Sequence, residues 1–487
     1  MKMLFNSYFF IFIYLPIVVA IFFVCCYFHL KKGAQLFLLI SSLIFYAYWD
    51  VRFVPLLCAS IFFNYIAGNQ IYNASTSQLK KLYLLLSLAF NLALLLYFKY
   101  LNFFISSANY FLSSEVKLLD IILPLGISFF TFTQIAYLVD VYQARAVPGG
   151  WRSYSLFVTV FPHLIAGPVL HHKEMITQFD NPANYQWSSY NFAQGTFLFV
   201  IGLAKKVLIA DAMYGYVTPV FDQNQTLIPF LQAWIGALAY SIELYFDFSG
   251  YSDMAVGLGL YFNIQLPLNF NSPYQATSMI DFWRRWHISL SNFLRDYLYI
   301  PLGGNRYGET RKLANLLITM LLGGAWHGAN WTFVVWGLCH GFFLMINHLW
   351  RKLNVNLSPL LGQLLTFFCV VVAFAIFRSP DLPRAWMILK GLFGYNGIIL
   401  PEKYEYSLAF LKAYGVAFER LHFSNVRLYD LLKILACLLA ILLLPNSMWW
   451  KERFIRYPIL AGLGLSALFI ICLIDLNAVT EFLYYQF

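Results

Sequence analysis

Long apolar runs recur along almost the whole chain and leave few folds open to it. The first runs from Tyr8 to Phe28, and a helix needs about 20 apolar residues to cross a bilayer. Because lipid offers no hydrogen-bond partners, the backbone inside it must form helices or a closed barrel. Of the 487 residues, 61% are hydrophobic and 11% are charged, whereas a soluble domain carries about 25% charge. We therefore predict an all-α, multi-pass membrane protein.

The apolar runs predict about 11–13 membrane crossings, with the usual error of a few residues at each end. The expected helices lie near 8–28, 34–49, 53–70, 82–98, 118–140, 153–170, 191–210, 229–247, 312–325, 331–349, 361–378, 430–447 and 457–475. Lysine and arginine pairs such as Lys31-Lys32 and Lys80-Lys81 then gather on one side, which is cytoplasmic by the positive-inside rule. We expect one integral membrane domain over 1–487, with a cytoplasm-facing polar and amphipathic segment at 247–312 and a C-terminal helix and tail at 457–487.

The net charge of +10 fits basic cytoplasmic loops beside membrane lipids, and the sequence has no nucleic-acid-binding signature. Seven cysteines show no C-x-x-C spacing, so we predict buried thiols and no metal site. The run from Tyr8 to Phe28 is too long for the core of a signal peptide, and we expect it to be retained as a membrane helix.

His327 stands in the motif Gly-Gly-Ala-Trp-His-Gly-Ala-Asn-Trp at 323–331, between two apolar runs. An ionisable group at membrane depth is costly, which makes it a candidate functional residue. Imidazole is suited to accept and return a proton near neutral pH. Trp326 and Trp331 place an indole on either side of it in the sequence. A hydrogen-bonded structural histidine between helices is the alternative interpretation.

A second polar region, 281–300, has the spacing of one amphipathic helix. It carries Trp283, Arg284, Arg285, Trp286 and His287, and Arg306 follows it. One interpretation is a helix resting on the anionic inner leaflet. The other is a wall of a cytosolic pocket, whose cations and indoles hold an anionic donor such as the phosphates of coenzyme A.

Several long motifs occur together and in order along nearly the whole chain. They include Pro-Leu-Gly-Ile-Ser-Phe-Phe-Thr-Phe at 124–132, Phe-Pro-His-Leu-Ile-Ala-Gly-Pro at 161–168, Tyr-Phe-Asp-Phe-Ser-Gly-Tyr-Ser-Asp at 245–253, Asn-Phe-Asn-Ser-Pro-Tyr at 269–274, Phe-Trp-Arg-Arg-Trp-His-Ile-Ser-Leu at 282–290 and Gly-Ala-Trp-His-Gly at 324–328. Together they resemble the membrane-bound O-acyltransferase (MBOAT) family, and within it the bacterial branch that supplies acetyl groups to exported polysaccharides such as alginate.

This resemblance implies a ring of tilted transmembrane helices, with re-entrant or amphipathic helices, around a central tunnel. It implies that His327 and His287 are the two site histidines. It also implies that a tyrosine in the C-terminal tail carries the acyl group to an extracytoplasmic, SGNH esterase-like acetyltransferase. Tyr484 matches that position, and Tyr485 stands where phenylalanine is usual.

We therefore expect an O-acyltransferase of the bacterial inner membrane that passes acetyl from cytosolic acetyl-CoA to an exported, alginate-like polysaccharide. Acetyl-CoA is its donor substrate, and no cofactor is expected to bind tightly. Peptidoglycan, cellulose, teichoic acid or a lipid remain alternative acceptors. The competing class is a non-catalytic transporter or channel, for which inverted repeats would be the sequence signature; none is visible in the sequence.

Overall fold

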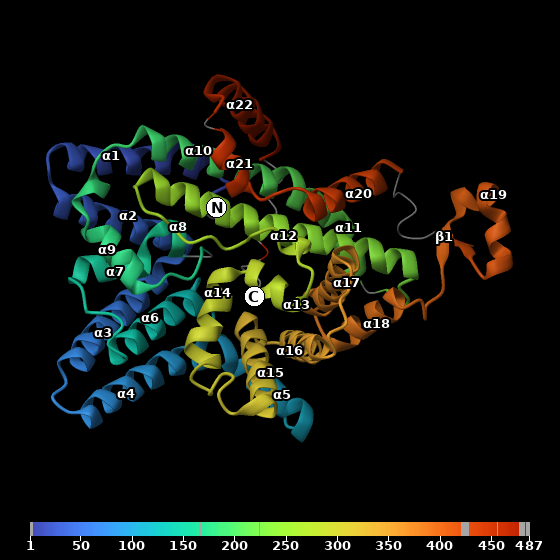
Figure 1. Ribbon diagram of the computed structural model, residues 1–487, viewed down its shortest axis with the longest axis horizontal. Coiled ribbons are helices and arrows are strands. Elements are labelled where there is room, and N and C mark those ends of the chain that lie inside the picture. Colours follow the sequence, from blue (N-terminus) through green and yellow to red (C-terminus); the bar gives the residue numbers. More distant parts are fainter. Residues whose placement is uncertain are drawn as a thin grey trace. The chain divides into compact units, whose positions relative to one another are not determined.

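The computed structural model of the protein describes residues 3–164, 167–223, 225–419, 428–454, 456–476 and 483 (Figure 1). Within these residues, six helical stretches are long and apolar enough to cross a membrane: Phe10–Tyr27, Lys31–Asn73, Ser77–Leu112, Trp331–Lys352, Pro359–Arg378 and Pro458–Asp475. Tyr429–Leu443 and Ser447–Phe454 form a further apolar pair that is bent by 76°. The predicted helical, multi-pass fold is confirmed, and the count of about 11–13 crossings stays a prediction.

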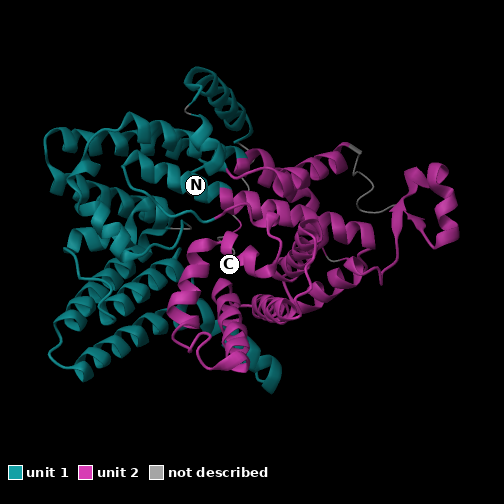
Figure 2. Ribbon diagram, in the orientation of Figure 1, with its two compact units in different colours: residues 1–204, 250–269, 447–477 teal, residues 205–249, 270–446, 478–487 magenta. Residues whose placement is uncertain are grey.

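The chain forms two compact units that interleave along the sequence (Figure 2). Unit 1 comprises 1–204, 250–269 and 447–477. Its helices are α1 (Leu15–Tyr27), α2 (Lys31–Asp50), α3 (Val54–Asn73), α4 (Ser77–Leu95), α5 (Leu101–Leu112), α6 (Ile127–Tyr142), α7 (Trp151–Thr159), α8 (Phe161–Leu164), α9 (His172–Asp180), α10 (Ser189–Ala204), the second part of α12 (Phe230–Tyr261), α21 (Ser447–Phe454) and α22 (Pro458–Asp475).

Unit 2 comprises 205–249, 270–446 and 478–487. It holds the π-helical turns η5 (Lys205–Ala210) and η7 (Arg295–Tyr299), and a short parallel pair of strands, β1 (Ile399–Pro401) and β2 (Ala417–Glu419). Its α-helices are α11 (Asp211–Phe221), the first part of α12, α13 (Met279–Arg285), α14 (Ile288–Leu294), α15 (Gly308–His327), α16 (Trp331–Lys352), α17 (Pro359–Arg378), α18 (Leu382–Leu392), α19 (Glu405–Leu408) and α20 (Leu428–Leu443).

Three predicted spans have different boundaries in the structure. The span at 118–140 begins only at Ile127, after Gly126 with its left-handed φ of 67°. The span at 153–170 is two helices, α7 and α8, because Pro162 has no N–H to donate and can begin a helix but not continue one. The span at 229–247 continues to Tyr261 as α12, and every residue from 239 to 264 is buried.

In unit 1, α10 and the second part of α12 meet through glycines. A Cβ added at Gly202 would lie 2.4 Å from the carbonyl oxygen of Gly250, and one added at Gly195 would lie 2.6 Å from that of Gly257. The two contacts are seven residues, about two helical turns, apart on each helix. Small residues let membrane helices approach this closely, so the two backbones leave no room for side chains at these positions.

We expect Gly202→Ala to lower the stability of the protein. The new methyl group meets backbone, which cannot rotate away, and overpacking of this kind costs about 1–3 kcal/mol. Thermal unfolding of the purified protein in detergent measures the effect. Gly215→Ala in α11 is the matched control, since nothing lies within 4 Å of a Cβ at that position. Equal midpoints for the two variants would contradict the close helix contact.

Candidate active site

His327 is the last residue of α15, and a helical hairpin fixes its place. A Cβ added at Gly324 would lie 2.4 Å from the carbonyl oxygen of Phe333, and one at Gly337 would lie 2.4 Å from that of Met320. These contacts bring α15 and α16 together as antiparallel neighbours (Figure 1). Asn330 begins α16 by accepting the N–H of Thr332 at 3.1 Å, which satisfies one of the free donors at a helix start. The imidazole is therefore held at the closed end of a tight hairpin.

Aromatic rings enclose the His327 side chain, which is 7% exposed. The ring centroids of Trp326 and Trp336 both lie 5.1 Å from that of the imidazole, and that of Phe377 lies 5.5 Å away. These rings come from α15, α16 and α17. Such an enclosure limits the access of water to the imidazole.

His287 lies at a break between α13 and α14, so the prediction of one amphipathic helix over 281–300 is wrong. α13 ends at Arg285, and His287 has a left-handed φ of 43° before α14 begins. The Asn271 N–H donates to the Arg285 carbonyl at 2.9 Å, a group that the end of a helix leaves without an internal partner. A left-handed, non-glycine residue costs of order 1–3 kcal/mol and is often found at a functional site.

The structure brings the two predicted histidines together. Their ring centroids are 6.4 Å apart, and the Phe248 ring packs edge-on against His287 at 4.8 Å. His287 is 1% exposed, and burial lowers its pKa to about 3 by disfavouring the charged form. A neutral imidazole offers one donor and one acceptor nitrogen. The pair can therefore accept a proton from a hydroxyl and hold a second polar group beside it.

The indoles and the cations of the predicted donor site differ in their surroundings. Trp283 and Trp286 are buried, and the Trp283 indole N–H donates to Nδ1 of His340 at 3.3 Å. Arg284 and Arg306 have exposed side chains. Arg285 is half-buried and pairs with Asp281 at 2.9 Å. Binding of a donor by these residues stays a prediction, and Tyr484 and Tyr485 lie outside the described residues.

Sequence reasoning missed one member of the aromatic cluster, Trp336, which lies one helical turn before the packed histidine His340. His340 is fully buried and packs edge-on against Trp336 at 4.7 Å, while Trp336 packs edge-on against His327. The signal was present in the sequence, because residues four apart on a helix share a face. Trp331, the other indole that flanks His327 in the sequence, is instead 41% exposed at the start of α16.

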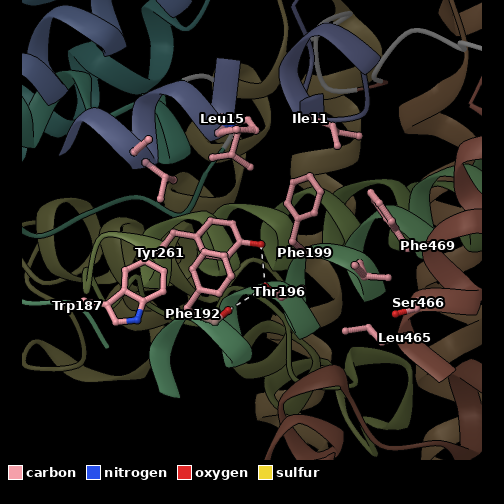
Figure 3. Close-up of a pocket in the computed structure, with 14 residues that line it drawn as sticks. Ile11, Leu15, Trp187, Phe192, Thr196, Phe199, Tyr261, Leu465, Ser466 and Phe469 are labelled. Carbon is pink, nitrogen blue, oxygen red and sulfur yellow. Dashed lines mark hydrogen bonds between the residues drawn. The ribbon is translucent and has the colours of Figure 1, made fainter. Parts of the chain in front are cut away.

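An apolar pocket of about 430 Å³ lies in unit 1, whereas both histidines belong to unit 2. It is lined by α1, α10 and α22, and the Tyr261 and Thr196 hydroxyls meet in it at 3.1 Å (Figure 3). It has hydroxyl groups but no titratable base or cation in its wall. Its lining is unsuited to acid–base chemistry, so the histidine pair remains the candidate active site.

Comparison with known proteins identifies the family. The family model for MBOAT, membrane-bound O-acyltransferases, matches residues 47–377. The chain belongs to the MBOAT family. It is 44% identical to the peptidoglycan O-acetyltransferase of Helicobacter pylori, over 82% of this chain and 81% of that protein. It is 42% identical to the probable alginate O-acetylase AlgI of Pseudomonas aeruginosa, over 82% and 76%.

A more distant relative is the teichoic acid D-alanyltransferase of Streptococcus thermophilus, 28% identical over 55% of this chain and 70% of that protein. This MBOAT protein is thus an O-acyltransferase, and the expected enzyme class and family are confirmed. The competing prediction of a non-catalytic transporter or channel is set aside by the family match over 47–377, which contains both histidines.

We expect Gly324→Ala to reduce acyl transfer by this MBOAT protein roughly a hundredfold, the order of loss that a displacement of about 1 Å can cause. The methyl group would push α15 from α16 three residues before His327. Gly215→Ala in α11 is the control, because nothing lies within 4 Å of a Cβ at that position. Turnover with a saturating acyl donor measures both variants, and full activity of Gly324→Ala would refute the positioning role of the hairpin.

Proposed function

We propose that this protein takes acetyl from cytosolic acetyl-CoA and passes it across the bacterial inner membrane for O-acetylation of an exported, alginate-like polysaccharide. The observation that carries the proposal is the His287–His327 pair, whose rings lie 6.4 Å apart among buried aromatic side chains. The O-acetyltransferases among its relatives support acetyl as the transferred group. On this proposal the protein is a single MBOAT domain, and its substrates reach it beside membrane lipids.

His327 acts as the general base in the proposed transfer. It takes the proton of an attacking hydroxyl, the hydroxyl oxygen bonds to the acetyl carbon, and the carbon–sulfur bond of the thioester breaks. The imidazolium then gives the proton to the departing coenzyme A thiolate, so protons and charge balance. His287 orients the hydroxyl or the thioester carbonyl. Arg284, Arg285 and Arg306 hold the phosphates of the donor, with Trp283, Trp286 and Trp326 around its acyl end.

Tyr484 supplies the attacking hydroxyl and carries the acetyl group outward. A phenol has a pKa of about 10 and leaves an ester readily, which suits a carrier that must release its acetyl group again. An extracytoplasmic, SGNH esterase-like partner then accepts the group. Tyr485 is the alternative carrier, since both tyrosines stand in the same short tail.

The acceptor has a second candidate. The relative from Helicobacter pylori is named for peptidoglycan and is 44% identical to this chain, whereas the AlgI relative from Pseudomonas aeruginosa is 42% identical. Identity therefore favours neither acceptor. Acetylation assays with alginate-like polymers and with peptidoglycan, each with its esterase-like partner, distinguish the two.

We expect His327→Ala to lower acetyl transfer by about 10²–10⁴, the usual loss on removal of a general base. The measurement is the release of coenzyme A from acetyl-CoA by the purified protein. His348→Ala is the matched control, because His348 lies on the neighbouring helix α16 and is only half-buried. Near-normal transfer by His327→Ala would refute the assignment of the base.

We expect Tyr484→Phe to abolish polysaccharide acetylation without changing donor binding, because only the phenolic oxygen is removed. Mass spectrometry of the C-terminal peptide after incubation with acetyl-CoA detects the acetyl ester directly. Tyr485→Phe should keep both the ester and the acetylation. Full acetylation by the Tyr484→Phe protein would exclude this position, and full acetylation by the double variant would exclude the tail as carrier.

A further inference from the structure

Two buried ring nitrogens of α16 have no hydrogen-bond partner among the residues that the structure describes. They are Nε2 of His340 and Nε1 of Trp336. The two residues are 0% and 2% exposed, and both belong to unit 2, as His287 and His327 do. A buried polar group without a partner is costly and rare in folded proteins. Two of them in one cluster of rings therefore indicate a site for a further polar group.

The hydrogen bond from Trp283 decides which nitrogen of His340 carries the proton. The Trp283 indole N–H donates to Nδ1 of His340 at 3.3 Å, and a ring nitrogen that accepts a hydrogen bond does not bear a proton. The imidazole is then neutral, with its single proton on Nε2. The indole Nε1 of Trp336 can only donate. Both nitrogens are therefore N–H donors, and the group that they require is an acceptor.

The α15–α16 hairpin holds these donors beside His327. Trp336 and His340 are about one helical turn apart on α16, and their ring centroids lie 4.7 Å apart. The indole packs edge-on against the His327 imidazole at 5.1 Å. A Cβ added at Gly337, the residue after Trp336, would lie 2.4 Å from the carbonyl oxygen of Met320 in α15. This close helix contact keeps the indole against the imidazole.

Acyl transfer generates an acceptor of the kind that these donors require. When the hydroxyl oxygen bonds to the thioester carbon, an electron pair of the C=O bond moves onto the carbonyl oxygen. That oxygen stays negative until the carbon–sulfur bond breaks, when the pair returns to the C=O bond and the thiolate takes the proton from His327. Fixed N–H donors in a site that excludes water stabilise such a charge strongly.

We infer that the Nε2–H of His340 and the Nε1–H of Trp336 form an oxyanion site, which takes the carbonyl oxygen of the acyl thioester. The inference deepens the proposed function and rests on it for His327 as the base of the same reaction. It makes His340 and Trp336 catalytic residues and leaves His287 to orient the hydroxyl. Trp283 is also a positioning residue, because its indole fixes the tautomer of His340.

Trp336→Phe tests the site, because it removes one N–H donor and keeps an aromatic ring. Loss of one oxyanion donor lowers kcat by about 10²–10³, and we expect a loss of this order for acetyl transfer by the full-length protein in detergent. KM for acetyl-CoA should change little, since the charge forms only in the transition state. Trp234→Phe is the matched control. Its indole N–H donates to the Leu392 carbonyl at 3.0 Å, and kcat should stay normal.

Two variants of His340 test the second donor. His340→Leu removes the Nε2–H and should lower kcat by the same order as Trp336→Phe. His340→Gln keeps an amide N–H that can reach the position of Nε2, so we expect it to restore part of the lost turnover. Thermal unfolding of each variant in detergent identifies any that does not fold. His340→Leu and Trp336→Phe remove different donors, so either one tests the site if the other is unfolded.

Normal kcat in the folded Trp336→Phe and His340→Leu proteins would overturn the oxyanion site. A higher KM with unchanged kcat would also overturn it, because the donors would then bind the ground state and the transition state equally. His327→Ala, assayed in parallel, keeps the two proposals separate. Loss of transfer in His327→Ala alone would support the base and refute the oxyanion site. Loss in Trp336→Phe alone would support the oxyanion site and refute the base.

Discussion

Complete burial of α12 from residue 239 to its end sets the conditions for much of the structure around it. Residues 239 to 264 form one continuous buried stretch. A helix without a solvent or lipid face needs close neighbours, and Gly250 and Gly257 provide the space for α10. A carboxylate on such a helix is costly to bury without a partner. The Lys206 ammonium provides one for Asp247, at 2.6 Å. Packing and charge pairing on one helix are thus linked requirements.

The same principle of close backbone contact recurs at the candidate active site. Gly324 and Gly337 let α15 and α16 touch, and the hairpin ends at His327. The break at His287 has a different effect. The left-handed backbone there changes the direction of the chain between α13 and α14, and the imidazole is buried as a result. Strain in the backbone and tight helix contact together bring the two rings within 6.4 Å.

Within the described residues of unit 2, the most buried ion pairs meet at Lys206. The Lys206 ammonium lies 2.7 Å from the Asp211 carboxylate and 2.6 Å from the Asp247 carboxylate, so it neutralises part of the negative charge that α11 and α12 bury.

The sequence by itself determined the membrane class, the helical fold and the pair His287 and His327. Apolar composition forces helices in lipid, and a histidine among glycines and tryptophans is conspicuous at membrane depth. Only the tertiary structure decided that 281–300 is broken at His287, that Trp336 and His340 complete the aromatic cluster, and that Lys206 pairs with both Asp211 and Asp247. Periodicity reports which residues share a helix face. It does not report which distant segments meet, because those contacts depend on glycine-sized gaps and on charges that must find partners across the fold.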